Sequence, residues 1–152
     1  MNVKDRCNPC SRRRLLQVLA VGTATAPLGC GGGPAAPEPF GTVTAGNAAD
    51  FPVGSLLAIP GAPAYIGRDE EGFYAMTSTC THEGCDMIAS GGLEPQGPHC
   101  NCHGARFDRH GNVLEGPAES PLTHFAVEVA ADGTVTVLGG TEVGARVRKS
   151  LA

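Results

Sequence analysis

The sequence predicts an all-β, antiparallel fold for the region from about residue 42 to residue 138. Two observations support this prediction. Short apolar or alternating runs recur along the region, and glycine or proline turn signals separate them. None of these runs is long enough to indicate a helix. The region has about one hundred residues, which is enough for one compact domain but not for two.

Each expected strand is a run bounded by turn residues. Pro60-Gly61 and Glu71-Gly72 separate runs in the first half of the region, and Ala131-Asp132-Gly133 separates two runs in the second half. The last of these turns gives the clearest hairpin signal in the chain. The expected strands are residues 42–44, 55–59, 64–66, 73–76, 125–129 and 134–137. Residues 139–152 are expected to form a C-terminal tail.

Two short clusters of cysteine and histidine lie between these halves. The first is Cys80-Thr81-His82. The second is Cys100-Asn-Cys-His103, and seventeen residues separate His82 from Cys100. Two thiolates on one iron and two imidazoles on the other can hold a [2Fe-2S] cluster. The same donors also suit tetrahedral zinc, although zinc leaves Cys85 and Cys102 without a role. A scaffold held together by disulfides is a third interpretation, but it gives no role to the two histidines at matched positions in the clusters.

The longer motifs resemble the two binding loops of Rieske iron-sulfur proteins. They read Cys80-Thr-His-Glu-Gly-Cys85 and Cys100-Asn-Cys-His-Gly-Ala-Arg-Phe-Asp108, and Gly116-Pro-Ala-Glu-Ser-Pro-Leu122 resembles the proline-rich loop that covers the cluster in that family. The resemblance implies four cluster ligands, which are Cys80, His82, Cys100 and His103. It also implies a disulfide between Cys85 and Cys102. The implied fold is a β base with a small cluster-binding subdomain, residues 80–122, inserted in it.

The resemblance further implies one-electron transfer by a carrier that is not itself a catalyst. Ala105 and Phe107 replace the serine and tyrosine whose hydroxyls raise the potential of quinol-oxidising relatives, so a lower potential is expected. Glu83 replaces an apolar residue that helps relatives of the cytochrome bc type to dock at a quinol site. This change favours a freestanding carrier. The alternative is a Rieske subunit of a quinol-cytochrome or arsenite-oxidase-like oxidoreductase complex.

The first thirty residues have the composition of an export signal. Five basic residues precede a modestly apolar run over residues 15–28, and they are Lys4, Arg6, Arg12, Arg13 and Arg14. The stretch Ser11-Arg-Arg-Arg-Leu-Leu16 resembles a twin-arginine signal, whose machinery exports proteins that have already folded. The apolar run is too short to cross a bilayer as a helix. Residues 1–29 are therefore expected to be cleaved and the mature protein to be periplasmic.

A lipid anchor is the expected attachment of the exported chain. Pro27-Leu-Gly-Cys30 resembles a lipoprotein processing site, in which Cys30 would carry the lipid. Residues 30–41 are rich in glycine, proline and alanine, and they are expected to form a tether. An ordinary soluble export signal, with Cys30 incidental, is the alternative.

The charge of the mature chain bears on its partners. From Cys30 onward there are fourteen Asp and Glu against six Lys and Arg, so the formal net charge is −8, compared with −4 for the whole chain. An excess of acid argues against nucleic acid and favours a basic redox partner, such as a basic cytochrome. Simple solubility of an exported protein would explain the charge equally well.

Overall fold

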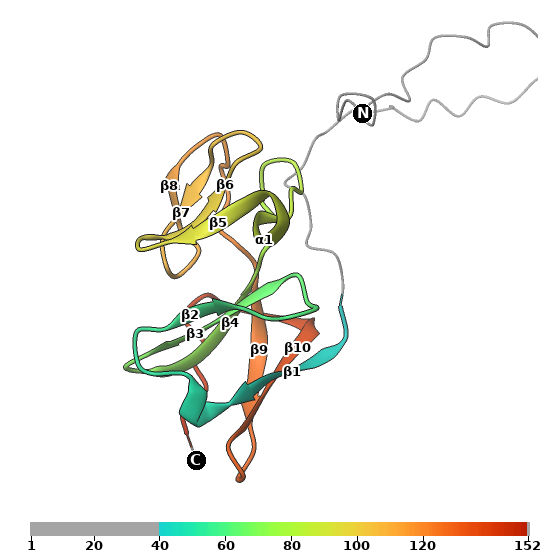
Figure 1. Cartoon of the computed structure of the whole chain (residues 1–152), viewed down its shortest axis with the longest axis vertical. Coiled ribbons are helices and arrows are strands. Elements are labelled where there is room, and N and C mark those ends of the chain that lie inside the picture. The colour runs from blue at the N-terminus through green and yellow to red at the C-terminus, as the bar shows by residue number, and fades with distance from the viewer. Residues whose placement is uncertain (1–39, 152) are drawn as a thin grey trace, which may run out of the picture. The chain divides into compact units, whose positions relative to one another are not determined.

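Two antiparallel sheets make up the described part of the chain, which is residues 40–151 of the computed structural model (Figure 1). The larger sheet has the strand order β1-β10-β9-β4-β3-β2 and the smaller one β5-β6-β7-β8. The strands of the larger sheet are β1 Thr42–Asn47, β2 Leu56–Ala58, β3 Ala64–Asp69, β4 Gly72–Thr77, β9 His124–Val129 and β10 Thr134–Val143. Those of the smaller sheet are β5 Gly91–Glu94, β6 Gly97–Cys100, β7 Arg106–Phe107 and β8 Val113–Glu115. The predicted all-β, antiparallel fold class is confirmed.

The smaller sheet is an insertion between two neighbouring strands of the larger one. Strands β4 and β9 pair directly, with Ala75 opposite Phe125 and Met76 opposite His124. The chain therefore leaves the larger sheet after β4, forms the smaller sheet, and returns beside the strand that it left. Figure 1 shows the inserted sheet at the end of the base opposite to the β9-β10 hairpin. The expected β base with an inserted subdomain is present.

Strands β3 and β4 are buried on both faces, because two cores meet on them. Ala64 and Ile66 pack into the core of the base, whereas Tyr65 between them packs against the inserted subdomain. Successive strand residues point to opposite faces of a sheet, so both sets must be apolar or aromatic. Met87 and Phe107 from the subdomain complete the second core. This core fixes the subdomain against the base.

Two short helices were not expected from the sequence. The 3-10 helix Ala48–Asp50 begins at Asn47, whose side chain accepts a hydrogen bond from the backbone of Ala49. Helix α1, Met87–Ser90, begins at Asp86, whose side chain accepts from the backbone of Ile88 at 2.9 Å. Each is stabilised by its cap, and neither is long enough to show a helical period. Within residues 40–151, no helix has the length and hydropathy of a membrane span.

The predicted domain end at residue 138 and the predicted tail over residues 139–152 are wrong. Strand β10 continues to Val143 and pairs again with β9 after a register shift between Leu138 and Glu142. Gly139 and Gly140, the first two residues of the expected tail, lie within this shift, as glycine often does in a bulged strand. Farther on, Lys149 exchanges backbone hydrogen bonds with Phe73, both at 2.9 Å. The C-terminal segment is therefore part of the base.

Arg148 links this C-terminal segment to both parts of the fold. Its Nε donates to Oδ2 of Asp69 at 2.6 Å, and its guanidinium lies 4.4 Å above the ring of Tyr74 on β4. Its Nη2 lies 3.2 Å from Nδ1 of His110, which belongs to the inserted subdomain. Burial would raise the pKa of the Asp69 carboxyl, but the hydrogen bond and the charge of Arg148 bring that pKa below its ordinary value.

Replacing Arg148 with alanine is expected to lower the free energy of unfolding by about 2 kcal/mol at neutral pH, because Asp69 loses a charged hydrogen-bond donor. The lowered folded-state pKa of Asp69 means that this stabilisation is present above the ordinary carboxyl pKa of about 3.9 and is lost as the pH falls through the folded-state value. The difference between wild type and variant should therefore narrow in acid. Denaturant unfolding at pH 7 and pH 3 measures both effects.

The exposed Arg146 provides the control, because its replacement by alanine removes the same charge from the same segment. That variant should unfold with nearly wild-type stability at both pH values. A loss for Arg148→Ala that is the same at pH 7 and pH 3 would show that the contact with Asp69 contributes little.

Candidate metal centre

Two turns of the same design carry the cysteine and histidine clusters. In the first, the backbone N–H of Gly84 donates to the carbonyl of Cys80, and in the second, Gly104 donates to Cys100, both at 2.9 Å. The two glycines have φ angles of 73° and 85°, which glycine adopts without a steric penalty. In both motifs the glycine follows the cysteine by four residues. The repeated spacing in the sequence therefore has a structural cause.

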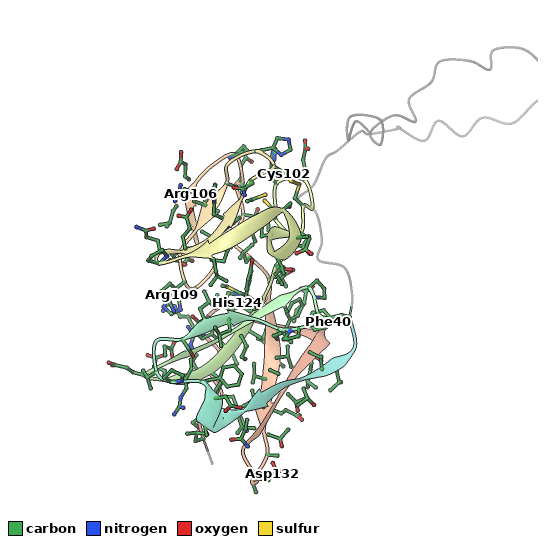
Figure 2. The ribbon with its side chains drawn as sticks, viewed as in Figure 1. Phe40, Cys102, Arg106, Arg109, His124 and Asp132 are labelled. Atoms are coloured by element: carbon green, nitrogen blue, oxygen red, sulfur yellow. A yellow bond between two sulfur atoms is a disulfide. The ribbon has the colours of Figure 1, made fainter. Side chains whose placement is uncertain are left out.

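Cross-links hold the two turns and the proline-rich loop together. Cys85 and Cys102 form a disulfide, as the family resemblance implied. The Thr81 hydroxyl donates to the carbonyl of Ser120 at 2.6 Å, which fastens the loop over residues 116–122 to the first turn. Figure 2 places Cys102 at the end of the subdomain that lies away from the base. The two turns and the loop over residues 116–122 thus form one end of the subdomain, which we call the tip.

Among residues 40–151, the two cysteines outside the disulfide form the buried side of this tip. Cys80 and Cys100 are each 1% exposed, and both are free thiols. They pack with Met87, Ala105 and Phe107 of the subdomain. Burial, with a further contribution from Cys100, raises the pKa of the Cys80 thiol. Metal cations reverse this effect, because they stabilise the thiolate directly. These two buried thiols are therefore suited to bind a metal as thiolates.

The two histidines form the outer side of the tip. The ring centroids of His82 and His103 lie 4.8 Å apart, with their planes at 81°. Nδ1 of His82 is buried and has no hydrogen-bond partner among residues 40–151. Such a nitrogen is unusual in a native protein, and it is the kind of atom that a metal ligand presents. Nε2 of His103 lies 3.6 Å from the Glu83 carboxylate, and its side chain is 45% exposed.

Possible donor atoms at the tip lie in two separate groups. The sulfurs of Cys85, Cys100 and Cys102 lie within 4.8 Å of one another, but Cys85 and Cys102 are joined in the disulfide, so Cys100 is the free thiol of this group. Donor atoms of His82, Glu83 and His103 form the second group, and within residues 40–151 no group of this kind combines a cysteine with a histidine. A single tetrahedral zinc would need all four donors of one site within about 4 Å of one another. A two-iron cluster instead needs thiolates at one end and imidazoles at the other. The donors therefore fit a [2Fe-2S] cluster better than zinc.

The other three histidines of the chain are engaged elsewhere. Nδ1 of His99 lies 3.3 Å from Glu94 on the small sheet, and His110 contacts Arg148. His124 is buried where the base meets the subdomain, with Nδ1 3.0 Å from a backbone carbonyl, and burial lowers its pKa. His99 and His110 thus have side-chain partners outside the proposed ligand set, and His124 belongs to the interface between the base and the subdomain.

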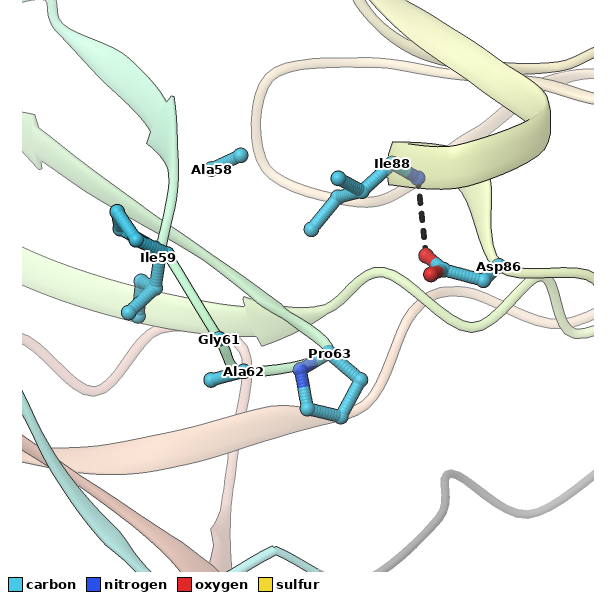
Figure 3. Close-up of a pocket in the computed structure, with 8 residues that line it drawn as sticks. Ala58, Ile59, Gly61, Ala62, Pro63, Asp86 and Ile88 are labelled. Atoms are coloured by element: carbon cyan, nitrogen blue, oxygen red, sulfur yellow. Dashed lines mark hydrogen bonds between the residues drawn. The ribbon is translucent and has the colours of Figure 1, made fainter.

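A surface hollow of about 450 Å³ lies between the turn over residues 59–63 and helix α1 (Figure 3). Its walls are mostly apolar and include Ile59, Pro63 and Ile88. The carboxylate of Asp86 at its edge already accepts hydrogen bonds from the backbone of Ile88 and from the Ser78 hydroxyl. The carboxylate of Asp86 is thus already used within the fold.

Comparison with known proteins agrees with the geometry of the tip. Residues 42–126, more than half of the chain, match the family model described as the Rieske [2Fe-2S] domain. The cytochrome b6-f complex iron-sulfur subunit of Prochlorococcus marinus is 30% identical, over 80% of this chain and 81% of that protein. The cytochrome b6-f complex iron-sulfur subunit 1 of the Cyanophora paradoxa cyanelle is also 30% identical, over 89% of this chain but only 66% of its own length.

Among solved structures, the plasma membrane Rieske protein of Synechocystis PCC 6803 is 29% identical, with a TM-score of 0.49 over 62% of this chain and 97% of that one. The family match and the Prochlorococcus relative each cover most of the folded region, and both include the two binding motifs. This chain belongs to the Rieske [2Fe-2S] family and is a one-electron transfer protein that carries an iron-sulfur cluster.

Proposed function

We propose that Cys80 and Cys100 bind one iron of the cluster and that His82 and His103 bind the other. The observation that carries this proposal is the pairing of two buried free thiols with two adjacent imidazoles, one of which has an unpartnered buried nitrogen. The two matched turns supply one cysteine and one histidine each. When bound, the cluster supplies a one-electron redox couple.

The residues around the tip define where electrons enter and leave. The sulfur side is shielded from water, because Cys80 and Cys100 are buried and the loop over residues 116–122 is tied down by Thr81. The imidazole side is open, since the His103 side chain is 45% exposed. We assign the histidine edge as the contact with redox partners, and the disulfide keeps the two turns in one position relative to each other.

The proposed setting is outside the cytoplasm. Residues 1–29 would be the twin-arginine export signal, Cys30 the lipidated residue and residues 30–41 the tether to the folded domain. Residues 1–39 of this segment lie outside the described range, which begins at residue 40. The acidic excess of the chain after Cys30 supports a basic partner, such as a cytochrome, that is attracted over long range.

A second candidate is a Rieske subunit of a larger oxidoreductase, either a quinol-cytochrome complex or an arsenite-oxidase-like enzyme. It is supported by the names of the relatives, several of which are cytochrome b6-f complex subunits. Glu83 favours the freestanding carrier, because a charged side chain beside the exposed His103 suits an aqueous partner better than an apolar quinol site. Mild purification from membranes separates the two: a stable large partner would identify a subunit.

Two experiments test the carrier proposal. Replacing Arg12, Arg13 and Arg14 together with lysine keeps the charge of the signal, and should leave the protein in the cytoplasm while wild type reaches the periplasm. Electron transfer to a basic cytochrome should slow as ionic strength rises, whereas transfer to an uncharged mediator should not. A periplasmic lysine variant would contradict the export route, and a salt-independent rate would contradict the basic partner.

Replacing Glu83 with glutamine is expected to raise the midpoint potential by about 10–40 mV, because a negative charge beside the imidazole end opposes an added electron. The estimate takes about 0.2–1 kcal/mol for an exposed charge interaction and 59 mV for each factor of ten. A redox titration at low salt measures the shift. Glu128→Gln on β9 removes the same charge from the base and should leave the potential unchanged. Equal shifts for both variants would mean that only net charge matters.

A further inference from the structure

An apolar groove lies along the seam between the base and the inserted subdomain. The hollow of about 450 Å³ described above lies between the turn over residues 59–63 and helix α1 (Figure 3). A second hollow of about 180 Å³ is lined by residues of strand β2, helix α1 and strand β5. The two hollows adjoin, because Ala58 and Ile88 line both of them. Together they form one surface, which we call the seam groove.

The walls of the seam groove expose large apolar side chains to water. Leu57, Ile88 and Leu93 are 48%, 40% and 37% exposed, and all three line the second hollow. Among the described residues, Asp86 is the only charged side chain in the walls of either hollow. An exposed apolar patch of this kind marks a binding surface. The seam groove therefore suits an apolar occupant.

The chain enters the described fold beside this groove. Phe40, the first described residue, packs against the core cluster of the base, to which Ile59 and Ala62 belong. Those two residues also line the first hollow. Figure 2 labels Phe40 toward the end of the base that carries the subdomain. The segment that precedes Phe40 in the sequence therefore begins within reach of the seam groove.

The sequence of this segment matches the chemistry of the groove. Residues 32–39 read Gly32-Gly-Pro-Ala-Ala-Pro-Glu-Pro39, with three prolines, two alanines and a single charge. Proline-rich segments favour the extended polyproline II conformation, which loses little entropy on binding, and they dock in apolar and aromatic grooves. At about 3.1 Å per residue, eight residues reach about 25 Å. That length is ample for two adjoining hollows of this size.

We propose that residues 32–39 of the tether lie in the seam groove, in contact with Ile59 and Ile88. Continuity of the chain favours this occupant, because a segment joined to its site has an effective concentration of about millimolar, well above that of a second copy in dilute solution. Docking covers apolar side chains on both sides of the seam and fastens the subdomain to the base. Neither the cluster ligands nor lipidation of Cys30 is needed for it.

Methyl groups on the two sides report this contact directly in NMR spectra of the full-length, oxidised protein. Nuclear Overhauser effects are expected from the methyls of Ala35 and Ala36 to those of Ile59 and Ile88. Wild type alone is needed, so the result does not depend on how a variant folds. An equal mixture of isotope-labelled and unlabelled chains identifies the occupant. Effects between two chains would show a second copy in the groove and overturn the proposal, and so would the absence of any effect.

A charge placed in the groove should release the segment. Ile88→Glu puts a carboxylate where the two hollows meet, at a side chain that is already 40% exposed. The backbone order parameters of Ala35 and Ala36 should be about 0.85 in wild type and below about 0.6 in this variant. Leu114→Glu on β8 is the control, because Leu114 is 57% exposed and lines neither hollow, and it should keep the wild-type values.

Three results of this comparison would overturn the docking. One is low order parameters for Ala35 and Ala36 in wild type. Another is wild-type values in Ile88→Glu, and the third is an equal fall in Ile88→Glu and Leu114→Glu.

Discussion

Replacing His82 with alanine is expected to abolish binding of the [2Fe-2S] cluster. The substitution removes the buried Nδ1 of His82, which has no hydrogen-bond partner within residues 40–151. The remaining ligands would hold an open iron, which is labile. Iron and acid-labile sulfide per protein chain should fall close to zero, and the visible absorption should disappear with them.

His99→Ala is the matched control for this experiment. His99 lies on the small sheet of the same subdomain and is half-buried, but its imidazole faces Glu94 rather than the tip. The control should keep its iron and its spectrum. Full iron content in His82→Ala, or equal losses in the two variants, would contradict the assignment of His82 as a ligand.

Removing the disulfide by replacing both Cys85 and Cys102 with alanine is expected to lower the free energy of unfolding by about 3 kcal/mol. The two cysteines are 17 residues apart in the sequence, and cross-links that close loops of this size restrict the unfolded chain by about that amount. The turns that carry the ligands would also move apart more readily, so the cluster should be lost faster. Denaturant unfolding and the decay of visible absorption measure the two effects.

Added thiol reductant distinguishes the disulfide from the loss of two side chains. Wild type in reductant should approach the stability of the double variant, whereas the double variant should not respond. If reductant leaves wild-type stability unchanged while the bond is shown to be open, the disulfide has no role in holding the tip.

The sequence predicts the base of the fold well because most of its strands have local signals. All six expected strands are present in the larger sheet, including the hairpin around Ala131-Asp132-Gly133. The errors arise where a local signal has a tertiary meaning. The folded region was expected to end at residue 138, but Gly139 and Gly140 lie in a register shift inside β10, and pairing with Phe125 and His124 continues beyond them. Only the partner strand reveals this.

The geometry of the binding motifs was predictable because each proposed ligand lies in or beside a turn that the sequence encodes locally. The four expected ligands meet at one tip, and the expected disulfide joins the two turns. The contacts of Arg148 were not predictable, because they join segments far apart in the chain. Arg148 reaches Asp69 across 79 positions, and neither residue belongs to a motif. Such contacts follow from the packing of the subdomain on the base.

The most direct test of the central claim is an EPR and nitrogen-hyperfine measurement on the reduced full-length protein, prepared with and without isotopically labelled histidine. We expect the signal of one reduced [2Fe-2S] cluster coupled to two imidazole nitrogens, with hyperfine lines that change on labelling. A cluster signal without nitrogen coupling would contradict the mixed ligand set. Protein that stays iron-free after anaerobic reconstitution and binds one zinc instead would contradict the cluster itself.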